Sequence, residues 1–177
     1  MAKSRNHVTA FAILILLTTL VAVAPGQSDV RATLQPAKQR KPAPEFTLPD
    51  SLGKQGTLKQ YQGKILVLDF WATWCHGCKE EIPWFVEFQQ KYGKRGLEVV
   101  GVSMDEEGWK VVKPFIETTK VPYRIVLGNE SIFKKYGLES MPDTFIIDRQ
   151  GRVAAVYHGL IDKDDMEKNI LAMLAER

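Results

Sequence analysis

Short runs rich in β-branched and aromatic residues alternate with helical patterns along the later three quarters of the chain. The expected elements are, in order, strand Ile65–Trp71, helix Gly77–Tyr92, strand Leu97–Met104 and helix Trp109–Thr119. This alternation indicates βαβ units and a partly parallel sheet. Two later runs, 144–147 and 153–157, are separated by a turn sequence ending in Gly151, which predicts an antiparallel pair. A final helical pattern runs from an N-cap at Asp162 to about Glu176.

The first 26 residues, the leader segment, have a different pattern. Lys3 and Arg5 precede the uncharged run Val8–Ala24, and small residues accompany its end. A basic start, an apolar run and small residues are the layout of an export signal. The run is also at the short limit for a membrane-spanning helix. Residues 1–26 are therefore expected to be a signal peptide or an N-terminal membrane anchor, with cleavage favoured. The location expected for the rest of the chain is extracytoplasmic, in the periplasm or at the outer face of the cytoplasmic membrane.

Residues 27–43 contain few large apolar side chains, and they carry Pro36 and Pro42, with Pro44 directly after them. This composition predicts an extended, semi-rigid and solvated linker. Residues 44–177 are then expected to form one domain, since a chain of 177 residues has room for one domain and a tail.

Composition places the chain among ordinary globular proteins. Hydrophobic residues make up 45% and charged residues 25%, which argues against disorder throughout. The formal net charge is +3, and Lys3 and Arg5 account for two of these charges. A nearly neutral domain gives no electrostatic basis for nucleic-acid binding.

The two cysteines of the chain, Cys75 and Cys78, are separated by two residues. They lie where the expected strand 65–71 is followed by helix 77–92, a position at which open α/β sheets place their active groups. The unpaired N–H groups and the dipole of the helix favour a Cys75 thiolate. We therefore expect Cys75 to attack a disulfide and the more buried Cys78 to resolve the mixed disulfide, which closes the Cys75–Cys78 bond. This chemistry needs no cofactor.

Other uses of a Cys-x-x-Cys pair fit less well. A structural disulfide that closes so few residues removes little loop entropy and joins no distant elements. Structural zinc needs about four ligands, and outside the leader segment only His76 and His158 remain as soft partners. Haem attachment needs a histidine directly after the second cysteine, where this chain has Lys79. The sequence therefore predicts neither a metal site nor a bound cofactor.

Asp69 is the one charged residue in the otherwise apolar strand 65–71. Burial beneath the cysteines would raise its pKa, and a carboxyl that titrates near neutral pH can accept the proton of Cys78 as a general base. The structural alternative is a side chain that caps a neighbouring backbone group. Glu81 lies three residues after Cys78, on the same helix face, and is a second candidate proton acceptor.

Two side chains beside Cys75 are expected to modulate the site. His76 would stabilise the thiolate when it is protonated, although an exposed histidine is mostly neutral at pH 7. Trp74 would shield the thiol and offer an apolar surface for docking. For Trp71 a core position is expected instead.

Several segments beyond the Cys-x-x-Cys pair resemble the thioredoxin superfamily, and within it the exported TlpA/ResA-like thiol-disulfide oxidoreductases. These segments are Ala43–Leu48, Gly63–Lys64, Phe70–Cys75, Glu81–Pro83, Val99–Ser103, Tyr136–Leu138 and Met141–Pro142. The resemblance covers nearly all of residues 43–177. It implies a thioredoxin-like α/β fold, with a central mixed β-sheet flanked by helices on both faces, and a redox-active disulfide between Cys75 and Cys78.

The resemblance also implies roles for residues distant from the cysteines. In the family, the proline that matches Pro142 is cis and lies against the disulfide, and the backbone before it pairs with substrate. Met141 and Pro142 are therefore implied as the substrate-docking edge. The helix glutamate of the family falls on Glu81, and its acid after the next strand falls on Asp105 or Glu106.

Two departures from the family pattern concern the redox potential. Gly77 stands where most exported relatives have proline, and Asp69 stands where many have asparagine. A shift of about 30 mV corresponds to only 1.4 kcal/mol, within reach of one altered hydrogen bond. The direction of electron transfer, reductant or oxidant, therefore stays open from sequence.

The leading interpretation is an exported thiol-disulfide oxidoreductase that reduces disulfides in client proteins, with apocytochromes c or oxidase-assembly factors as the client class the resemblance implies. Its second partner would be a membrane electron donor or acceptor protein, and the membrane itself only if the leader segment is uncleaved. A thiol peroxidase of the peroxiredoxin-like branch is one alternative, although Leu68 and Ala72 stand where peroxiredoxins place proline and threonine. A copper-binding redox module is another, although such carriers usually separate their cysteines by three residues.

Overall fold

The computed structural model describes residues 29–176. The strands are β1 (Thr47–Pro49), β2 (Gln55–Thr57), β3 (Ile65–Trp71), β4 (Leu97–Ser103), β5 (Arg124–Leu127), β6 (Asp143–Ile147) and β7 (Val153–His158). The helices are α1 (His76–Tyr92), α2 (Trp109–Thr119), α3 (Glu130–Tyr136) and α4 (Lys163–Ala175), and 3₁₀ turns cover Leu58–Tyr61 and Gly93–Arg95.

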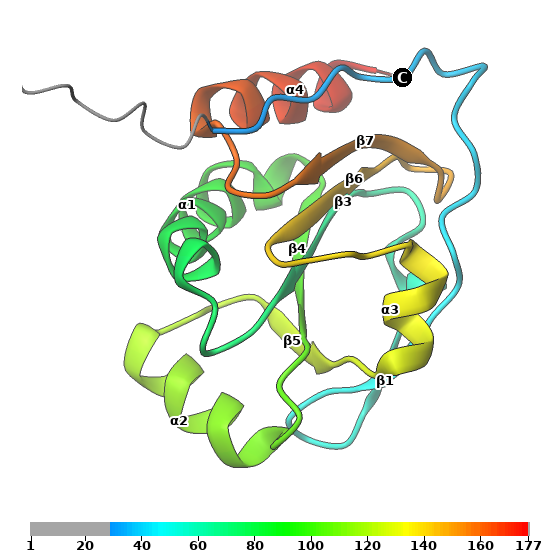
Figure 1. Ribbon diagram of the computed structural model, residues 1–177. Coiled ribbons are helices and arrows are strands. Elements are labelled where there is room, and N and C mark those ends of the chain that lie inside the picture. Colours follow the sequence, from blue (N-terminus) through cyan, green and yellow to red (C-terminus); the bar gives the residue numbers. More distant parts are fainter. Residues whose placement is uncertain (1–28, 177) are drawn as a thin grey trace, which may run out of the picture.

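Five strands form one central sheet in the order β5-β4-β3-β6-β7 (Figure 1). Strands β3, β4 and β5 are parallel, whereas β6 and β7 run antiparallel to their neighbours. Short β1 and β2 pair separately. The expected βαβ units, the antiparallel pair and the α/β class with a mixed sheet are therefore confirmed.

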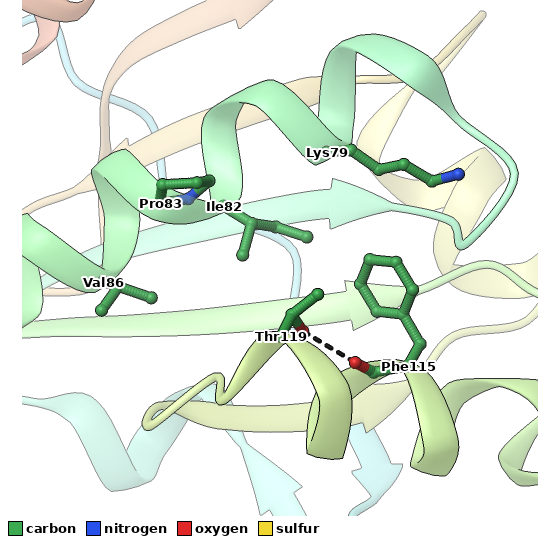
Figure 2. A pocket seen from close by; sticks show the side chains of 6 residues that line it. All are labelled: Lys79, Ile82, Pro83, Val86, Phe115 and Thr119. Atoms are coloured by element: carbon green, nitrogen blue, oxygen red, sulfur yellow. Dashed lines mark hydrogen bonds between the residues drawn. The ribbon is translucent and has the colours of Figure 1, made fainter.

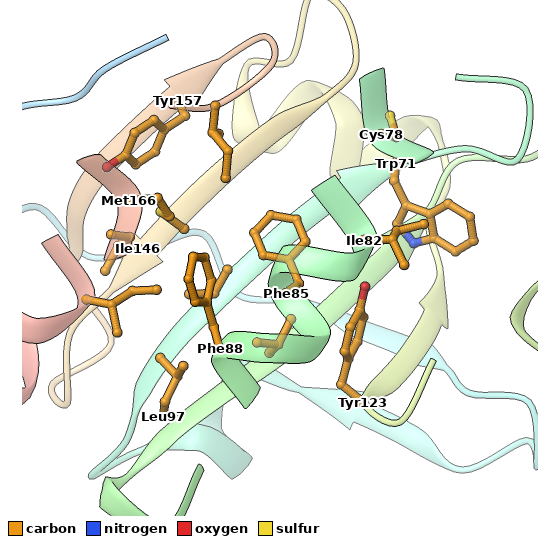
Figure 3. Packing of buried hydrophobic residues seen from close by; sticks show 14 of the residues in the cluster. Trp71, Cys78, Ile82, Phe85, Phe88, Leu97, Tyr123, Ile146, Tyr157 and Met166 are labelled. Atoms are coloured by element: carbon orange, nitrogen blue, oxygen red, sulfur yellow. The ribbon is translucent and has the colours of Figure 1, made fainter. Parts of the chain in front are cut away.

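Alternate side chains of β3 enter two different cores, one on each face of the sheet. Ile65, Val67 and Trp71 pack with helices α1, α2 and α4 in the first core, part of which Figure 3 shows. Leu66 and Phe70 pack with α3 and the β1–β2 region in the second. Every residue of β3 is buried, as expected for a central strand covered on both sides.

Helices α1 and α4 begin within one residue of their expected starts. Cys75 is the N-cap of α1, which continues through Pro83 as far as Tyr92. Asp162 is the N-cap of α4, and its side chain accepts a hydrogen bond from Asp165 N at 3.0 Å. The first of these caps places a sulfur atom at the positive end of a helix dipole.

Residues 29–42, the N-terminal strap, lie along helix α4 and strand β7 (Figure 1). The carbonyl of Val30 accepts a hydrogen bond from Asp162 N at 2.8 Å. Further along, the Asn169 amide donates to the carbonyl of Ala32 at 2.8 Å. The strap is extended apart from a turn at residues 37–39, and contacts near both of its ends join it to the domain.

Arg40 fixes the far end of the strap. Its guanidinium is buried and pairs with Glu176 at 2.6 Å and with Asp148 at 3.4 Å. The structure thus differs from the expected solvated linker, because contacts with residues more than 100 positions away hold the segment on the domain. The division into residues 1–26, 27–43 and 44–177 stays a prediction.

The leader segment, residues 1–26, lies outside the residues that the structure describes. Among residues 29–176, no helix has the length and apolar character needed to cross a membrane. The signal-or-anchor expectation is therefore carried by the sequence alone.

Candidate active site

Cys75 and Cys78 form a disulfide at the start of α1. The S–S distance is 2.01 Å, and the Cα atoms are 5.4 Å apart. Cys75 Sγ also accepts a hydrogen bond from Cys78 N at 3.2 Å, the contact that would stabilise a thiolate at this position. Cys75 is 6% exposed and Cys78 1%, so the first cysteine is the more accessible, as expected.

The loop before β6 lies against the start of α1. The Met141–Pro142 peptide bond is cis, as the resemblance implies. A Cβ atom on Gly77 would lie 3.4 Å from Pro142 Cδ, so the second residue between the cysteines faces this proline directly. Met141 is partly buried and Pro142 is buried.

The side chains on either side of Cys75 are exposed. Trp74 is 65% exposed, which fits a residue that covers the site from the solvent side. His76 points outward and lies 3.2 Å from Glu80 on the next helical turn. Trp71 lies in the core, where its ring packs 5.2 Å from that of Phe115. The core position expected for Trp71 is confirmed.

Two carboxyl groups are buried on the α1 face of the sheet. Asp69 and Glu81 are almost completely inaccessible, and burial raises the pKa of both far above the usual carboxyl range. The charge of Asp69 raises the pKa of Glu81 further, so the two groups interact. One Glu81 oxygen accepts a hydrogen bond from Ile161 N at 2.7 Å. Glu81 Oε2 and Asp69 Oδ1 find no hydrogen-bond partner among residues 29–176.

A third acid, Asp105, holds the loop that leads into Cys75. Its carboxylate accepts hydrogen bonds from Thr73 N at 3.0 Å, from the Thr73 hydroxyl at 2.5 Å and from the Ser103 hydroxyl at 2.9 Å. Glu106 is exposed. Of the two acids that the resemblance left open, Asp105 is therefore the one that contacts the active-site loop.

Sequence reasoning missed Asp143 and the use of His158. Asp143 directly follows Pro142, is buried, and lies 3.1 Å from His158 on β7. Burial raises the pKa of Asp143, and the contact with His158 partly offsets this effect. An acid at the start of the apolar run Thr144–Ile147 was a readable signal, because it repeats the anomaly that marked Asp69.

Two grooves flank Met141, one on each side. The first has a volume of about 390 Å³ and includes Val30, Gly77, Pro142 and His158 in its lining. The second, of about 610 Å³, is lined by residues that include Trp74, Met104, Asp105, Phe133 and Met141.

A separate apolar pocket of about 390 Å³ lies between α1 and α2 (Figure 2). Ile82, Val86 and Phe115 form its apolar walls, and Lys79 lies at its rim. In the described part of the chain, no three or more His, Cys, Asp and Glu side chains gather in a position to hold a metal ion.

Comparisons with known proteins agree with this geometry. The sequence profile described as the AhpC/TSA family matches residues 40–156. The thiol-disulfide oxidoreductase ResA of Geobacillus thermodenitrificans is 34% identical over 129 residues, and that of Bacillus thuringiensis subsp. konkukian is 37% identical over 130 residues; each match covers 72% of this chain and 74% of the relative. A Chlorobium tepidum crystal structure assigned as a thiol:disulfide interchange protein DsbE has a TM-score of 0.72 and 32% identity, and covers 77% of this chain and 97% of that chain.

Proposed function

The chain belongs to the AhpC/TSA family and, with its ResA-like relatives, to the thiol-disulfide oxidoreductases of the thioredoxin superfamily, and from this premise we propose that it reduces disulfides in client proteins outside the cytoplasm. The observation that carries the proposal is the Cys75–Cys78 disulfide at the N-terminus of α1, next to the Pro142 loop. An accessible cysteine backed by a buried one is the arrangement that a two-step exchange requires.

The exchange begins with the reduced enzyme. The Cys75 thiolate attacks one sulfur of the client disulfide, which breaks that bond, forms a mixed disulfide and releases one client thiolate. The Cys78 thiolate then attacks Cys75 Sγ and releases the second client thiolate. Two electrons pass to the client, whose thiolates take up protons, and the enzyme is left with the Cys75–Cys78 disulfide.

The buried carboxyls supply the proton acceptor for the second step. Cys78 must lose its proton before it can attack, and it is too buried for bulk water to take that proton easily. Glu81 follows Cys78 by nearly one helical turn, and Asp69 lies on β3 in the same core. Burial raises the pKa of Asp69 to about 8 and that of Glu81 to about 9. Both groups are therefore mostly protonated at neutral pH, and the ionised fraction that can accept the Cys78 proton grows as the pH rises.

Met141, Pro142 and Trp74 form the proposed docking edge. The Met141 backbone would pair with the client chain beside its disulfide, and the exposed Trp74 ring would cover the opposite side. His76 is proposed to tune the Cys75 thiolate from the exposed face. No resident cofactor takes part in this scheme.

The partners and the location follow from the same proposal. Apocytochromes c or oxidase-assembly factors are the proposed clients, and a membrane electron donor would return the enzyme to its dithiol form. The basic and apolar leader segment supports an extracytoplasmic location, in the periplasm or at the outer face of the cytoplasmic membrane.

The reduction potential of the Cys75–Cys78 pair tests the proposed direction. The full chain is equilibrated in glutathione and thioredoxin redox buffers, and the fraction of disulfide is measured after thiol trapping. A potential near that of thioredoxin, about −270 mV, is expected for a reductase. A potential near about −120 mV would identify an oxidant that introduces disulfides and would overturn the proposal.

The AhpC/TSA match favours a thiol peroxidase as a second candidate. The main argument against a peroxidase is Ala72, three residues before Cys75, because alanine has no hydroxyl group to hold a peroxide. Consumption of hydrogen peroxide by the reduced chain, without any protein disulfide present, would support the peroxidase. Reduction of insulin disulfides without peroxide consumption would support the oxidoreductase.

A further inference from the structure

Two bonds attach the docking edge to the end of strand β7. Gly159 N donates to the carbonyl of Pro142 at 2.8 Å. The second bond joins their chain neighbours: Asp143 follows Pro142, His158 precedes Gly159, and His158 Nδ1 lies 3.1 Å from Asp143 Oδ1. We propose that the Asp143–His158 pair, the latch, positions the Met141–Pro142 edge for client binding. This inference rests on the proposed function, because it needs Met141 and Pro142 to meet the client.

The burial of Asp143 explains why its one partner matters. Its carboxyl is 1% exposed, and its second oxygen, Oδ2, has no hydrogen-bond partner in the described part of the chain. A buried carboxyl with so few partners is costly to keep in place. The imidazole of His158 is therefore the side-chain contact that orients the Asp143 carboxyl, next to Pro142.

The latch forms part of a groove that the client must cross. His158 and Gly159 line the groove of about 390 Å³ together with Gly77, Met141 and Pro142. A client chain that pairs with the Met141 backbone would run along this groove. A small movement of residues 141–143 would misalign that pairing.

The latch belongs to different elements from the reacting atoms. It joins β6 to β7, whereas both cysteines lie at the start of α1. Loss of the latch should therefore weaken client docking directly, whereas it can reach the dithiol only indirectly, through the effect of the Asp143 charge on the pKa of Glu81. Asp143 and His158 are thus positioning residues.

The test uses the reduced full chain and two disulfides of different size. Insulin presents a disulfide within a polypeptide, whereas 5,5′-dithiobis(2-nitrobenzoate) has no backbone to pair with Met141. His158 is largely exposed, so His158→Ala is expected to fold normally. In His158→Asn, the amide nitrogen takes the place of imidazole Nδ1 and keeps the bond to Asp143. Lys134→Ala is the matched control, since it removes an exposed pair with Glu130 on α3.

The expected result for His158→Ala is about a fivefold rise in KM for insulin at unchanged kcat, the effect of one lost hydrogen bond. Its rate with 5,5′-dithiobis(2-nitrobenzoate) and its reduction potential should match the unmodified chain. His158→Asn should restore the KM, and Lys134→Ala should leave it unchanged.

Two results would contradict the proposed role of the latch without contradicting the proposed function. One is an insulin KM unchanged in His158→Ala, and the other is an equal loss of rate with both disulfides. Failure of the unmodified chain to reduce insulin would instead overturn the proposed function, and the latch with it. The two failures are therefore distinguishable.

Discussion

Asp69 and Phe70 are neighbours on strand β3, but their side chains enter opposite layers of the molecule with opposite chemistry. On the Asp69 side, within residues 29–176, polar atoms of Asp69, Trp71 and Glu81 are buried without a hydrogen-bond partner. On the Phe70 side, the rings of Phe70, Tyr136 and Phe145 pack 5.0 to 5.7 Å apart.

The difference shows a division of labour within one sheet. The aromatic layer gains free energy from burial and ring packing, whereas the α1 layer keeps unpaired polar groups that cost free energy. Such a cost is typical of functional sites. Stability and reactivity should therefore respond to substitutions on different faces of the same sheet.

The largest expected effect is on activity, from Cys75→Ser on the α1 layer. Disulfide exchange should be lost completely, because the attacking thiol is gone. The free energy of unfolding should fall by about 2 kcal/mol or less, since the disulfide closes a very short loop. Insulin reduction and chemical denaturation measure the two effects. Residual insulin reduction would contradict the assignment of the nucleophile.

The largest expected effect on stability comes from Phe145→Ala on the aromatic layer. Removal of a buried phenyl ring should lower the free energy of unfolding by about 3 to 5 kcal/mol. The reduction potential of the remaining folded protein should stay unchanged, because the ring lies on the other face of the sheet from Asp69. A shifted potential would show that the two layers are coupled.

The pH dependence of stability should come from the α1 layer. Burial raises the pKa of Asp69 and Glu81, so the folded state holds protons that the unfolded chain releases above about pH 4. Stability should therefore fall as the pH rises from about 4 toward neutral, by about 1.4 kcal/mol per pH unit for each such proton.

Substitution of the two carboxyls tests this dependence. Asp69→Asn combined with Glu81→Gln should remove most of the fall and leave the smaller part that the raised pKa of Asp143 contributes. Glu106→Gln, at an exposed carboxyl, should leave the fall in place. Thermal unfolding at a series of pH values provides the measurement. A slope that persists in the double variant would place the responsible protons elsewhere.

The smallest expected effect is that of Tyr136→Phe on the aromatic layer. The Tyr136 hydroxyl donates to the carbonyl of Pro44 at 2.8 Å, and its loss should cost about 1 kcal/mol. The ring stays in place, so the loss should be well below that of Phe145→Ala when both are measured by denaturant titration. If Tyr136→Phe lowered the free energy of unfolding as much as Phe145→Ala, the hydroxyl, and not the ring packing, would stabilise this layer.

The elements predictable from sequence are those long enough to show a period. Strands β3 and β4 and helices α1, α2 and α4 match their patterns closely. Strands β1, β2 and β5 have only three or four residues, too few for an alternation to stand out. Helix α3 did carry signals, an N-cap at Asn129 and a left-handed Gly137 after its last turn, but its seven residues form less than two full turns.

The site was predictable as far as it is local in sequence. Cys75, Cys78 and Glu81 lie on one helix, and Asp69 on the strand before it, so spacing and polarity reveal them. Asp143 and His158 are brought together by the register of two antiparallel strands. The strap is harder still, because the partners of Arg40 come from a turn and from the last described residue.

The course of the strap sets how the protein can be attached to anything else. Val30 lies in the groove beside Pro142, whereas Glu176 lies at the far end of α4, where it binds Arg40. A fusion partner or solid support joined just before residue 29 would therefore stand beside the redox face, the surface around the Cys75–Cys78 disulfide and Pro142, and would obstruct it. Immobilisation on an electrode or resin through the end of α4 would turn that face toward solution.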